Sequence, residues 1–579
     1  MFQTALTSID SYKTAHAEMY PEGTTQVYSN FTPRSLNHLK LSPELKAENK
    51  IVWFGLQGFL YELTEIWTNT FFKCDESAVC DEFQTFVAPF CGPNGFNIER
   101  VRALHRLGYL PIAIKALPEG SRVPVGVPVF TITNTHPDFY WLPNFLETWL
   151  SSELWKSSTS ATIAYAYRKI IEKWADVTGG SKEFIAFQGH DFSVRGMSGI
   201  ADSAKSGAGH LLSFMGTDNL PAVQYLNTYY RGKETFIGGS VPASEHSCMS
   251  TEAKDEELEV FRRLIKMYPS GIVSLVSDTY DFFQVITTYA TLLKDDILSR
   301  VPDSMGFAKV VFRPDSGDPV KIICGENIKT LQLPEGKQND LEYIGDWALD
   351  CIAQRVSDEA GHGNRGDSEA EDIFRVGDKY YKVKISIEWN RYDKQYYYMD
   401  GSEVLSVEQV TLTPEQKGAV ECLAEIFGTT TNDKGYKTLN QRVGLIYGDS
   451  ITPERCEEIL RQLALKGYAS DNIVFGIGSY TYQYQTRDTL GFAMKATYRV
   501  TNDKGCAIFK DPKTDNGTKK SARGLLCVHK APLSGDYILV DGVSVEGEQN
   551  GELELVYRDG SLIDMPVSIE QIRNRLAST

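Results

Sequence analysis

Seven polar residues in the middle of this chain follow short apolar runs, at the point where each run gives way to a loop. They are Asp218, Asp278, Asp315, Asp449, Arg195, Arg313 and His246, and glycines stand in the same loops at 216, 317, 448, 476 and 478. Carboxylates bind ribose hydroxyls or Mg²⁺, and arginines clamp phosphate with two parallel hydrogen bonds. Glycine loops ahead of helices offer bare N–H groups to a phosphate. The set therefore predicts a phosphorylated sugar as the ligand.

Each of these residues also has an ordinary structural explanation. Asp449 in GDSITPE could be a helix N-cap, and Arg313 with Asp315 could form an ion pair that holds a turn. His246 lies among small residues in GGSVPASEHSCMS and could simply start the helix that follows. Function is favoured over these alternatives because such residues recur in one kind of loop, after one predicted strand after another.

The elements that must position these loops repeat along the chain. Seven apolar runs lead into such loops: EFIAF, LLSFM, ETFI, GIVSLV, AKVVF, VGLIY and NIVF. Loop residues 190, 218, 246, 278 and 315 are 28, 28, 32 and 37 positions apart, and 449 and 478 are 29 apart. Short strands alternating with helical patterns predict βαβ units and a parallel sheet. A barrel is favoured, because it brings all of these loops to one face, whereas an open sheet brings only two or three.

The remainder of the chain has a different pattern. We expect an α/β fold in which residues 181–490 form an irregular (β/α) barrel-like catalytic domain. Residues 1–180 are predicted to form an N-terminal α+β domain, which the β-rich segment 491–579 completes. Residues 332–440 are predicted to be a small β-rich insertion within the barrel domain, because runs such as DKYYKVKISIEW alternate in polarity.

Composition excludes several classes of function. The chain has 59 basic and 76 acidic residues, a net charge of −17, so it lacks the basic field of a nucleic-acid or anionic-membrane binder. The ten cysteines form no CxxC pair and the start MFQTALTSIDSYK is not signal-like, so we expect reduced thiols in a cytoplasmic protein. No apolar run approaches the roughly 18 residues of a membrane span. Neither a GxxxxGK[ST] loop nor a well-placed GxGxxG occurs.

A set of longer motifs narrows the function. The motifs IDSYKTAHAEMYPEGT, HDFSVRGMSG, MGTDN, GGSVPASEHS, VSDTYD, FRPDSGDP, YGDS, TRDTLGFAMKATY and IFKDP occur in this order. Over residues 8–330 and 440–530 the chain closely resembles the nicotinamide phosphoribosyltransferases, the nicotinamide-specific branch of the type II phosphoribosyltransferase family. The resemblance implies transfer of phosphoribosyl from 5-phosphoribosyl 1-pyrophosphate to nicotinamide, giving nicotinamide mononucleotide and diphosphate in NAD salvage. It also implies Mg²⁺, coupled ATP hydrolysis through a transiently phosphorylated histidine, and a homodimer with shared active sites.

The resemblance also assigns roles to individual residues. His246 would accept phosphate from ATP, and Asp278 would hydrogen-bond to it and orient it. Nicotinamide would be held by Phe192, by Tyr12 of the partner subunit, by Asp218 and by Arg313. The phosphoribosyl and diphosphate groups would be held by Arg195, Asp315, Gly448, Asp449, Gly478, Ser479, Arg487, Lys495, Arg34, Lys510, Lys519 and Arg523. Mg²⁺ would bind through diphosphate, with Asp315 as the candidate protein ligand.

Asp218 decides between two related substrates. A carboxylate there would accept a hydrogen bond from the amide of nicotinamide and repel the carboxylate of nicotinate, at a cost of roughly 1–3 kcal/mol. A nicotinate phosphoribosyltransferase is therefore the alternative, and a non-catalytic binding protein on this scaffold is a more distant one. Two features depart from the family pattern. Gly476-Ile477-Gly478-Ser479-Tyr480 replaces several consecutive glycines, and the insertion at 332–440 is longer than the resemblance implies.

Overall fold

The computed structural model describes residues 4–92, 96–230, 236–361, 365–391, 397–511, 521–563 and 566–579. It divides into two compact units. Unit 1 comprises Met1–Pro242, Ile446–Leu460 and Ala469–Thr579, and unit 2 comprises Ala243–Leu445 and Arg461–Tyr468. No helix within the described residues is long and apolar enough to cross a membrane.

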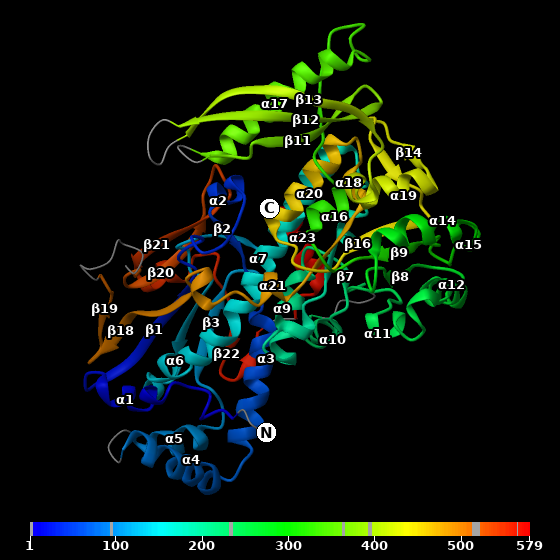
Figure 1. Cartoon of the computed structure of the whole chain (residues 1–579). Coiled ribbons are helices and arrows are strands. Elements are labelled where there is room, and N and C mark those ends of the chain that lie inside the picture. Colours follow the sequence, from blue (N-terminus) through cyan, green and yellow to red (C-terminus); the bar gives the residue numbers. More distant parts are fainter. Residues whose placement is uncertain are drawn as a thin grey trace. The chain divides into compact units, whose positions relative to one another are not determined.

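A seven-stranded sheet in unit 1 joins the two ends of the chain. Its order is β19 (Lys504–Ala507), β18 (Ala493–Thr501), β1 (Thr24–Thr32), β5 (Phe130–Asn134), β3 (Ile112–Ala116), β22 (Glu554–Arg558) and β23 (Ser561–Leu562). The blue β1 lies beside the orange β18 in Figure 1, and they pair antiparallel from Thr24 with Thr501 to Thr32 with Ala493. The ring of Phe31 stacks on those of Phe130 and Phe492. The predicted α+β domain built from both chain ends is confirmed.

Helix α7 (Glu147–Thr178) is the longest helix of unit 1, and small residues let it pack closely on α9 (Ile200–His210). A Cβ on Gly209 would lie 2.6 Å from the backbone oxygen of Ser157, so the two helices approach with backbone in contact. The Ser160 and Ser206 hydroxyls are hydrogen-bonded at 2.8 Å in this buried contact. Helices α10 (Leu220–Tyr229) and α23 (Ile569–Ala577) contribute to the same core. Small residues therefore allow α7 to contact α9 closely, while large side chains such as Trp149 and Ile171 are also buried along the helix.

Parallel strands occur in both units and confirm the predicted α/β class. In unit 1, β6 (Gly189–Asp191) pairs with β7 (Gly216–Thr217) and with β17 (Val474–Ile477). In unit 2, β9 (Val310–Arg313) pairs with β8 (Val273–Val276). Strand β16 (Val443–Tyr447) pairs with β9 through its first three residues and with β17 through its last two.

Two predicted strands are wrong. EFIAF contains the helix α8 (Ile185–Gln188), and LLSFM is a turn after α9, so strands β6 and β7 begin only at Gly189 and Gly216. Short apolar runs fit a buried helical turn as well as a strand, and periodicity cannot separate the two. The run ETFI falls partly on residues 231–235, outside the described residues, and Gly239 beyond it forms one parallel bridge to Gly216.

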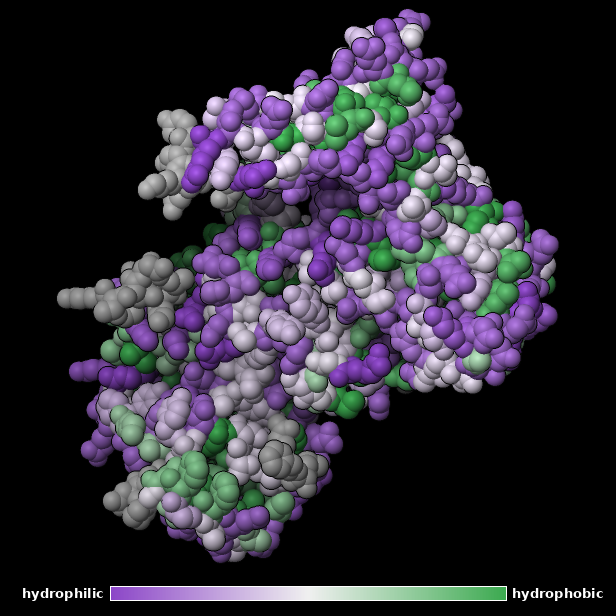
Figure 2. Space-filling view, in the orientation of Figure 1, coloured by the Kyte–Doolittle hydropathy of each residue, from purple (hydrophilic) through white to green (hydrophobic). Residues whose placement is uncertain are grey.

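The insertion has a core of its own within unit 2. Strands β10 (Lys329–Thr330), β11 (Glu369–Val376), β12 (Lys379–Arg391) and β13 (Tyr397–Val410) form a sheet, which α17 (Leu341–Ala360) covers in Figure 1. The alternation that predicted these strands buries Val383 and Ile385 under the helix. Ion pairs between Lys384 and Glu369 and between Lys382 and Glu371 join neighbouring strands. Figure 2 shows hydrophilic side chains over much of the insertion.

The other α-helices and strands are divided between the two units. In unit 1 they are α1 (His16–Met19), α2 (Pro43–Glu48), α3 (Leu56–Trp67), α4 (Glu76–Cys91), α5 (Ile98–Leu107), α6 (Leu142–Phe145), α21 (Ser479–Tyr482), α22 (Val545–Glu548), β2 (Lys50–Val52), β4 (Arg122–Pro124), β20 (Leu525–Lys530) and β21 (Tyr537–Val543). In unit 2 they are α11 (His246–Met249), α12 (Glu257–Met267), α13 (Phe282–Gln284), α14 (Ala290–Leu292), α15 (Lys294–Leu298), α16 (Pro319–Cys324), α18 (Pro414–Lys417), α19 (Ala419–Phe427), β14 (Thr429–Thr431) and β15 (Lys437–Leu439). Helix α20 (Pro453–Leu465) crosses from unit 1 into unit 2.

Candidate active site

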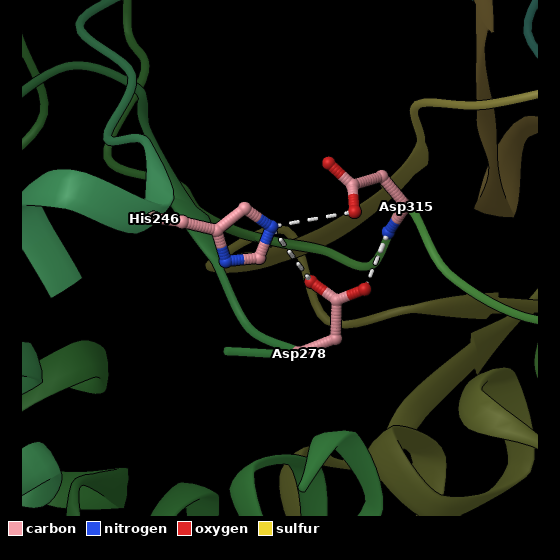
Figure 3. Close-up of side chains that lie close together, drawn as sticks. All are labelled: His246, Asp278 and Asp315. Carbon is pink, nitrogen blue, oxygen red and sulfur yellow. Dashed lines mark hydrogen bonds and ion pairs between the residues drawn. The ribbon is translucent and has the colours of Figure 1, made fainter. Parts of the chain in front are cut away.

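In unit 2, His246 stands at the start of α11 with its ring half exposed. Its side chain is 48% exposed, and Nε2 lies 3.4 Å from Asp315 Oδ1. Nδ1 lies 3.1 Å from the hydroxyl of Thr279. Figure 3 shows the ring reaching toward the two aspartates that follow strands β8 and β9. A helix-start residue without chemistry would have no need of two facing carboxylates.

Asp278 is the buried member of this group. Its side chain is only 4% exposed, and Oδ2 accepts hydrogen bonds from the backbone N–H of Asp315, the backbone N–H of Ser316 and the Ser316 hydroxyl, at 2.9, 2.9 and 2.6 Å. Oδ1 is buried, makes no hydrogen bond within the described residues, and lies 3.9 Å from Nε2 of His246. The carboxylate therefore fixes the turn after β9 and directs its second oxygen at the imidazole. The sequence predicted a hydrogen bond between Asp278 and His246, but the 3.9 Å between Oδ1 and Nε2 is the distance of an ion pair.

Arg313 braces the segment that carries His246. Its Nη2 donates to the backbone oxygen of Ser244 at 2.5 Å, two residues before the histidine. The Ser244 hydroxyl in turn accepts from the backbone N–H of Val276 at 2.9 Å, in strand β8. The guanidinium predicted to hold a ligand thus already holds the loop, which fixes its own position.

The same residues suit a divalent cation. One ligand atom each from His246, Asp278 and Asp315 lie within 4.8 Å of one another. Two carboxylates supply the oxygen donors that Mg²⁺ prefers, and Oδ1 of Asp278 is a buried oxygen with capacity to spare within the described residues. The imidazole nitrogen is the weaker match, so the carboxylates are the ligands that the chemistry favours.

Unit 1 holds a second histidine–aspartate pair. His190 Nε2 lies 2.9 Å from Asp218 Oδ1, and the Ser240 hydroxyl donates to the same oxygen. His190 is 12% exposed and Asp218 is 40% exposed, so the carboxylate is the accessible member. The backbone N–H of Asp218 also donates to the Asp191 oxygen at the end of β6. This arrangement presents an anchored carboxylate at the end of a parallel strand.

Phe192 packs beside this pair because two neighbouring residues are glycines. Its ring centroid lies 4.8 Å from that of His190. A Cβ on Gly476 would lie 2.5 Å from Phe192 Cδ2, and a Cβ on Gly216 would lie 2.8 Å from Nδ1 of His190. Both rings therefore lie against bare backbone, a close approach that only glycine permits. The structure thus places an aromatic ring beside the anchored carboxylate of Asp218.

The loop Gly478-Ser479 opens onto free space. A Cβ on Gly478 would meet nothing within 4 Å, and Ser479 begins α21. A Cβ on Gly196 would contact the Ser479 side chain, so the turn that carries the exposed Arg195 lies against this loop. The Tyr480 side chain is 52% exposed. Its bulk, which departs from the family pattern, is directed into solvent.

The buried side chain of His210 helps to hold α21 in place. The Tyr482 hydroxyl is 2.7 Å from Nδ1 of His210, whose Nε2 is 3.2 Å from the Gly216 oxygen. A carbonyl only accepts, so Nε2 carries the proton and Nδ1 accepts from the tyrosine. Burial lowers the pKa of His210, which keeps the imidazole neutral. The His210 side chain thus links β7, which leads to Asp218, with helix α21, which begins at Ser479.

Asp449 is not the cap of the helix that follows it. Thr452 accepts the backbone N–H of Arg455 at 3.2 Å and fills that role. Asp449 is exposed, beyond Gly448, and Ser450 after it has a left-handed φ of 47°. The backbone oxygen of Ile451 accepts from Thr481 at 2.9 Å, which ties this turn to α21. Asp449 is therefore free of the structural role that was its main alternative.

A basic group lies further along unit 1. The pKa of Lys495 is lowered, chiefly by burial, and the positive charges of Arg34, Lys510 and Arg487 lower it further. The charge of Glu147 opposes this shift, and the group of cations suits an anion. Arg523 lies nearby in sequence and stacks on Phe509 at 5.0 Å. Lys519, also predicted here, lies outside the described residues.

Several residues of these groups were not predicted. Thr279 and Ser316 complete the group around His246, and Ser240 and His190 complete the one around Asp218. Each is a neighbour, within two residues in sequence or across a strand pair, of a predicted residue. His210 had no signal, because it lies inside a helix and becomes informative only when Tyr482 and Gly216 are brought to it.

Parallel strands whose loops present carboxylates, a histidine and open glycine backbone define an α/β protein built to bind charged sugar-type ligands. The model of the nicotinate phosphoribosyltransferase (NAPRTase) family matches residues 187–344 and 406–544. A nicotinamide phosphoribosyltransferase of Acinetobacter baylyi is 46% identical over 574 residues, which is 99% of this chain and 97% of that protein. The chain belongs to the NAPRTase family.

Further relatives extend the comparison. A nicotinamide phosphoribosyltransferase of Mycoplasma pneumoniae is 29% identical and covers 90% of this chain and 94% of its own length. One of Xanthomonas campestris is 29% identical and covers 98% and 97%. Among solved structures, human nicotinic acid phosphoribosyltransferase matches with a TM-score of 0.45 and 13% identity over 98% of this chain and 93% of that one.

Proposed function

We propose that this protein is a pentosyltransferase that transfers the phosphoribosyl group of 5-phosphoribosyl 1-pyrophosphate to nicotinamide, releasing diphosphate. Membership of the family and a relative of that name at 46% identity support the reaction. Breaking the bond from C1 to diphosphate leaves an electron-poor ribose and a highly charged leaving group. The chain offers carboxylates for the first, including Asp449, and the cations around Lys495 for the second.

The observation that carries the choice of base is the anchored carboxylate of Asp218. His190 and Ser240 fix one of its oxygens, and the side chain remains 40% exposed beside the ring of Phe192. It would accept a hydrogen bond from the amide NH₂ of nicotinamide. The carboxylate of nicotinate would meet a like charge there, at a cost of roughly 1–3 kcal/mol. The pyridine nitrogen is already a competent nucleophile, so the protein needs to orient it rather than deprotonate it.

We further propose that ATP hydrolysis is coupled through His246. Two carboxylate oxygens face Nε2, so the proton lies there and the lone pair of Nδ1 is left as the nucleophile. Thr279 can donate to Nδ1 until the phosphate arrives. Attack of Nδ1 on the terminal phosphorus of ATP would form a P–N bond and release ADP, and water would later break that bond to give phosphate. Asp278 and Asp315 would stabilise the positive ring during both steps.

Mg²⁺ and a second subunit complete the proposal. Asp315 would hold the cation together with diphosphate oxygens, and Mg²⁺ would supply charge neutralisation of the leaving group. Tyr12 is 60% exposed near the N-terminus and would cover the nicotinamide ring bound by a partner subunit in a homodimer. Both roles rest on the family resemblance.

Steady-state assays with each base test the proposal. Purified protein would receive 5-phosphoribosyl 1-pyrophosphate, Mg²⁺ and either nicotinamide or nicotinate. We expect kcat/KM for nicotinamide to be higher by about 5- to 150-fold, the factor that corresponds to the electrostatic cost at Asp218. A preference for nicotinate would favour the alternative, a nicotinate phosphoribosyltransferase. Turnover of neither base would favour a binding protein on the same scaffold.

A further inference from the structure

The first turn of helix α7 holds the segment that carries Tyr12. Glu147, the first residue of α7, accepts a hydrogen bond from the ammonium of Lys13 at 2.5 Å. Thr148 holds the other side of the segment, because its hydroxyl donates to Oδ2 of Asp10 at 2.6 Å and accepts the backbone N–H of that residue at 3.2 Å. Tyr12 thus lies between two tethers to one helical turn.

Asn144, in α6, supplies a third tether. Its Oδ1 accepts a hydrogen bond from the Lys13 ammonium at 2.9 Å, and its Nδ2 lies 2.7 Å from Nδ1 of His16. Lysine only donates, so the amide oxygen faces Lys13 and the amide N–H donates to His16. Burial and then the charge of Lys13 lower the pKa of His16, which keeps this imidazole neutral and able to accept. The segment is therefore held at positions 10, 13 and 16.

The ring of Tyr12 remains exposed on this anchored segment. The Tyr12 residue is 60% exposed, although Lys13, next to it in the chain, is only 5% exposed. Nζ of Lys13 lies 5.6 Å from the centre of the Tyr12 ring, and the ring of His16 lies 5.3 Å from it between centroids. These contacts limit the positions that the tyrosine ring can take. Tyr12 is therefore a preorganised aromatic group with much of its surface open to a partner.

Glu147 also acts on the basic group of unit 1. Helix α7 contacts both strand β18, which carries Lys495, and the turn that begins at Arg487. The pKa of Lys495 is lowered first by burial, and the charge of Glu147 opposes this shift. The charges that add to the shift are those of Arg34, Lys510 and Arg487. One carboxylate therefore pairs with the lysine beside Tyr12 and supports the positive charge of Lys495.

We propose that Glu147 is a positioning residue, which holds the ring of Tyr12 through Lys13 and keeps Lys495 cationic, so that both groups are presented in one fixed arrangement. This inference rests on the proposed function, in which Tyr12 covers the nicotinamide ring and the basic group meets diphosphate. The entering base and the leaving diphosphate meet the same ribose carbon, so the groups that hold them need a fixed separation. Both groups lie in unit 1 of one protomer, and Glu147 is the side chain that acts on both.

Replacing Glu147 by glutamine tests both halves of this proposal. Glu147→Gln keeps the shape of the side chain and removes its charge. We expect KM for nicotinamide to rise about 10-fold, with kcat changed less, because the segment that carries Tyr12 loses its ion pair. The alkaline limb of kcat/KM for 5-phosphoribosyl 1-pyrophosphate should move to lower pH, because the charge that favours the protonated form of Lys495 is gone. A loss of stability alone would not move this limb.

Two further variants separate the two effects. Lys13→Met removes the ion pair but keeps the charge of Glu147, so KM for nicotinamide should rise while the alkaline limb does not move to lower pH. Glu153→Gln is the matched control, because Glu153 also lies on α7 but pairs with Lys205 of α9. Its KM for nicotinamide and its alkaline limb should equal those of the parent.

Two measurements test the role of Glu147 without turnover. Hydrogen–deuterium exchange of the full chain should be faster over residues 10–16 in Glu147→Gln and Lys13→Met than in the parent and in Glu153→Gln. Calorimetric titration with inorganic diphosphate, repeated across alkaline pH, should lose affinity at a lower pH in Glu147→Gln than in the parent. Unchanged exchange over residues 10–16, or an unchanged pH limit for diphosphate binding, would overturn the proposal.

These readouts separate a failure of this proposal from a failure of the proposed function. A parent protein that converts neither nicotinamide nor nicotinate refutes the proposed function, and exchange and diphosphate binding then still decide the role of Glu147. Melting temperatures verify that each variant is folded. If Glu147→Gln is unfolded, the double variant Lys13→Met/Glu147→Gln, which buries no unpaired lysine, carries the same expectations.

Discussion

The two histidine–aspartate pairs of this protein have opposite burial. In unit 2 the histidine is the exposed member, at 48%, and the aspartate is buried, at 4%. In unit 1 the histidine is 12% exposed and the aspartate 40%. The same two side chains thus form a supported imidazole in one place and a supported carboxylate in the other. Under the proposed function, the exposed member of each pair meets the ligand and the buried member positions it.

The partners of each buried member explain the difference. Asp278 uses one oxygen on three donors of the turn after β9, so it cannot move toward a ligand. His190 packs on the backbone of Gly216 and beside Phe192, so its ring is equally fixed. Fixed groups of this kind are what keep a reacting or recognising group in productive geometry. The comparison therefore makes separate predictions for reaction and for recognition.

Removing the exposed imidazole should have the largest effect. We expect His246→Ala to form no phosphorylated protein with ATP and to lose ATP stimulation of turnover, a fall of about 100-fold or more. Mass spectrometry of the intact protein after incubation with ATP and Mg²⁺ measures the phosphate. Cys248→Ser is the control on the same short helix, because Cys248 is exposed. Phosphate still bound to His246→Ala would show that the exposed imidazole in unit 2 is not the group that accepts it.

Neutralising the exposed carboxylate should change the choice of base. Asp218→Asn keeps the shape of the side chain but removes the charge that repels nicotinate. We expect the ratio of kcat/KM for nicotinamide over nicotinate to fall about 5- to 150-fold. Asp138→Asn, at an exposed aspartate on another loop, should leave the ratio unchanged. An unchanged ratio in Asp218→Asn would show that recognition lies elsewhere.

Filling the space under Phe192 should weaken nicotinamide binding. A methyl group at Gly476→Ala would lie 2.5 Å from the ring and must displace it. We expect a loss of about 1–3 kcal/mol in stability and a KM for nicotinamide raised about 10-fold, with kcat changed less. Thermal unfolding of Gly478→Ala is the comparison, because a Cβ there meets nothing within 4 Å. Equal melting temperatures for the two variants would contradict the role of the bare backbone.

The hydrogen bond between Tyr482 and His210 should also contribute to the stability of the protein. Tyr482→Phe removes the hydroxyl that donates to His210 and leaves a buried acceptor unpaired, at a cost of about 1–3 kcal/mol. Denaturant unfolding measures this loss, and KM for 5-phosphoribosyl 1-pyrophosphate should rise because α21 loosens. Tyr480→Phe, two residues away and exposed, should change stability by less than about 0.5 kcal/mol. Similar losses of stability in the two variants would show that the hydrogen bond to His210 has no special role in holding α21.

Glu257 sharpens the contrast with Asp278, because it is a buried carboxyl whose Oε1 makes no hydrogen bond within the described residues. Burial, and the charge of Asp281, raise its pKa to about 7. The folded state therefore holds a proton that the unfolded state has lost, and the free energy of unfolding falls as pH rises from about 4.5 to 7. We expect Glu257→Gln to be more stable than the parent at pH 8 by about 1–3 kcal/mol and to show little difference at pH 4.5. A constant difference across that range would mean that Glu257 does not titrate there.

The sequence predicted which polar residues come together better than it predicted the individual strands. Loop spacing placed His246, Asp278 and Asp315 after successive strands, and the structure brings the three together. EFIAF and LLSFM were wrong as strands, because short apolar runs do not reveal whether the partner is a neighbouring strand or a helix. The burial order of each pair was not predictable either, since it depends on Gly216, Gly476 and the turn at Ser316 coming from distant parts of the chain.

In the insertion, by contrast, the sequence predicted a strand correctly. Alternation in DKYYKVKISIEW predicted strand β12 correctly, because one face is buried under α17 and the other carries the ion pairs of Lys382 and Lys384. Helix α17 was not identified, since most of it lies outside the residues that the family model matches and only a narrow set of its residues is buried. Alternating polarity in the sequence identifies a strand where one face of the sheet is exposed to solvent and the other is buried.

One assay tests the central claim most directly. Purified protein would be given nicotinamide, 5-phosphoribosyl 1-pyrophosphate and Mg²⁺, with and without ATP, and nicotinamide mononucleotide and ADP would be quantified by chromatography. The account predicts that nicotinamide mononucleotide forms, that ATP increases its yield, and that ADP is released in step with it. No nicotinamide mononucleotide in either reaction, or a yield that ATP leaves unchanged, would contradict it.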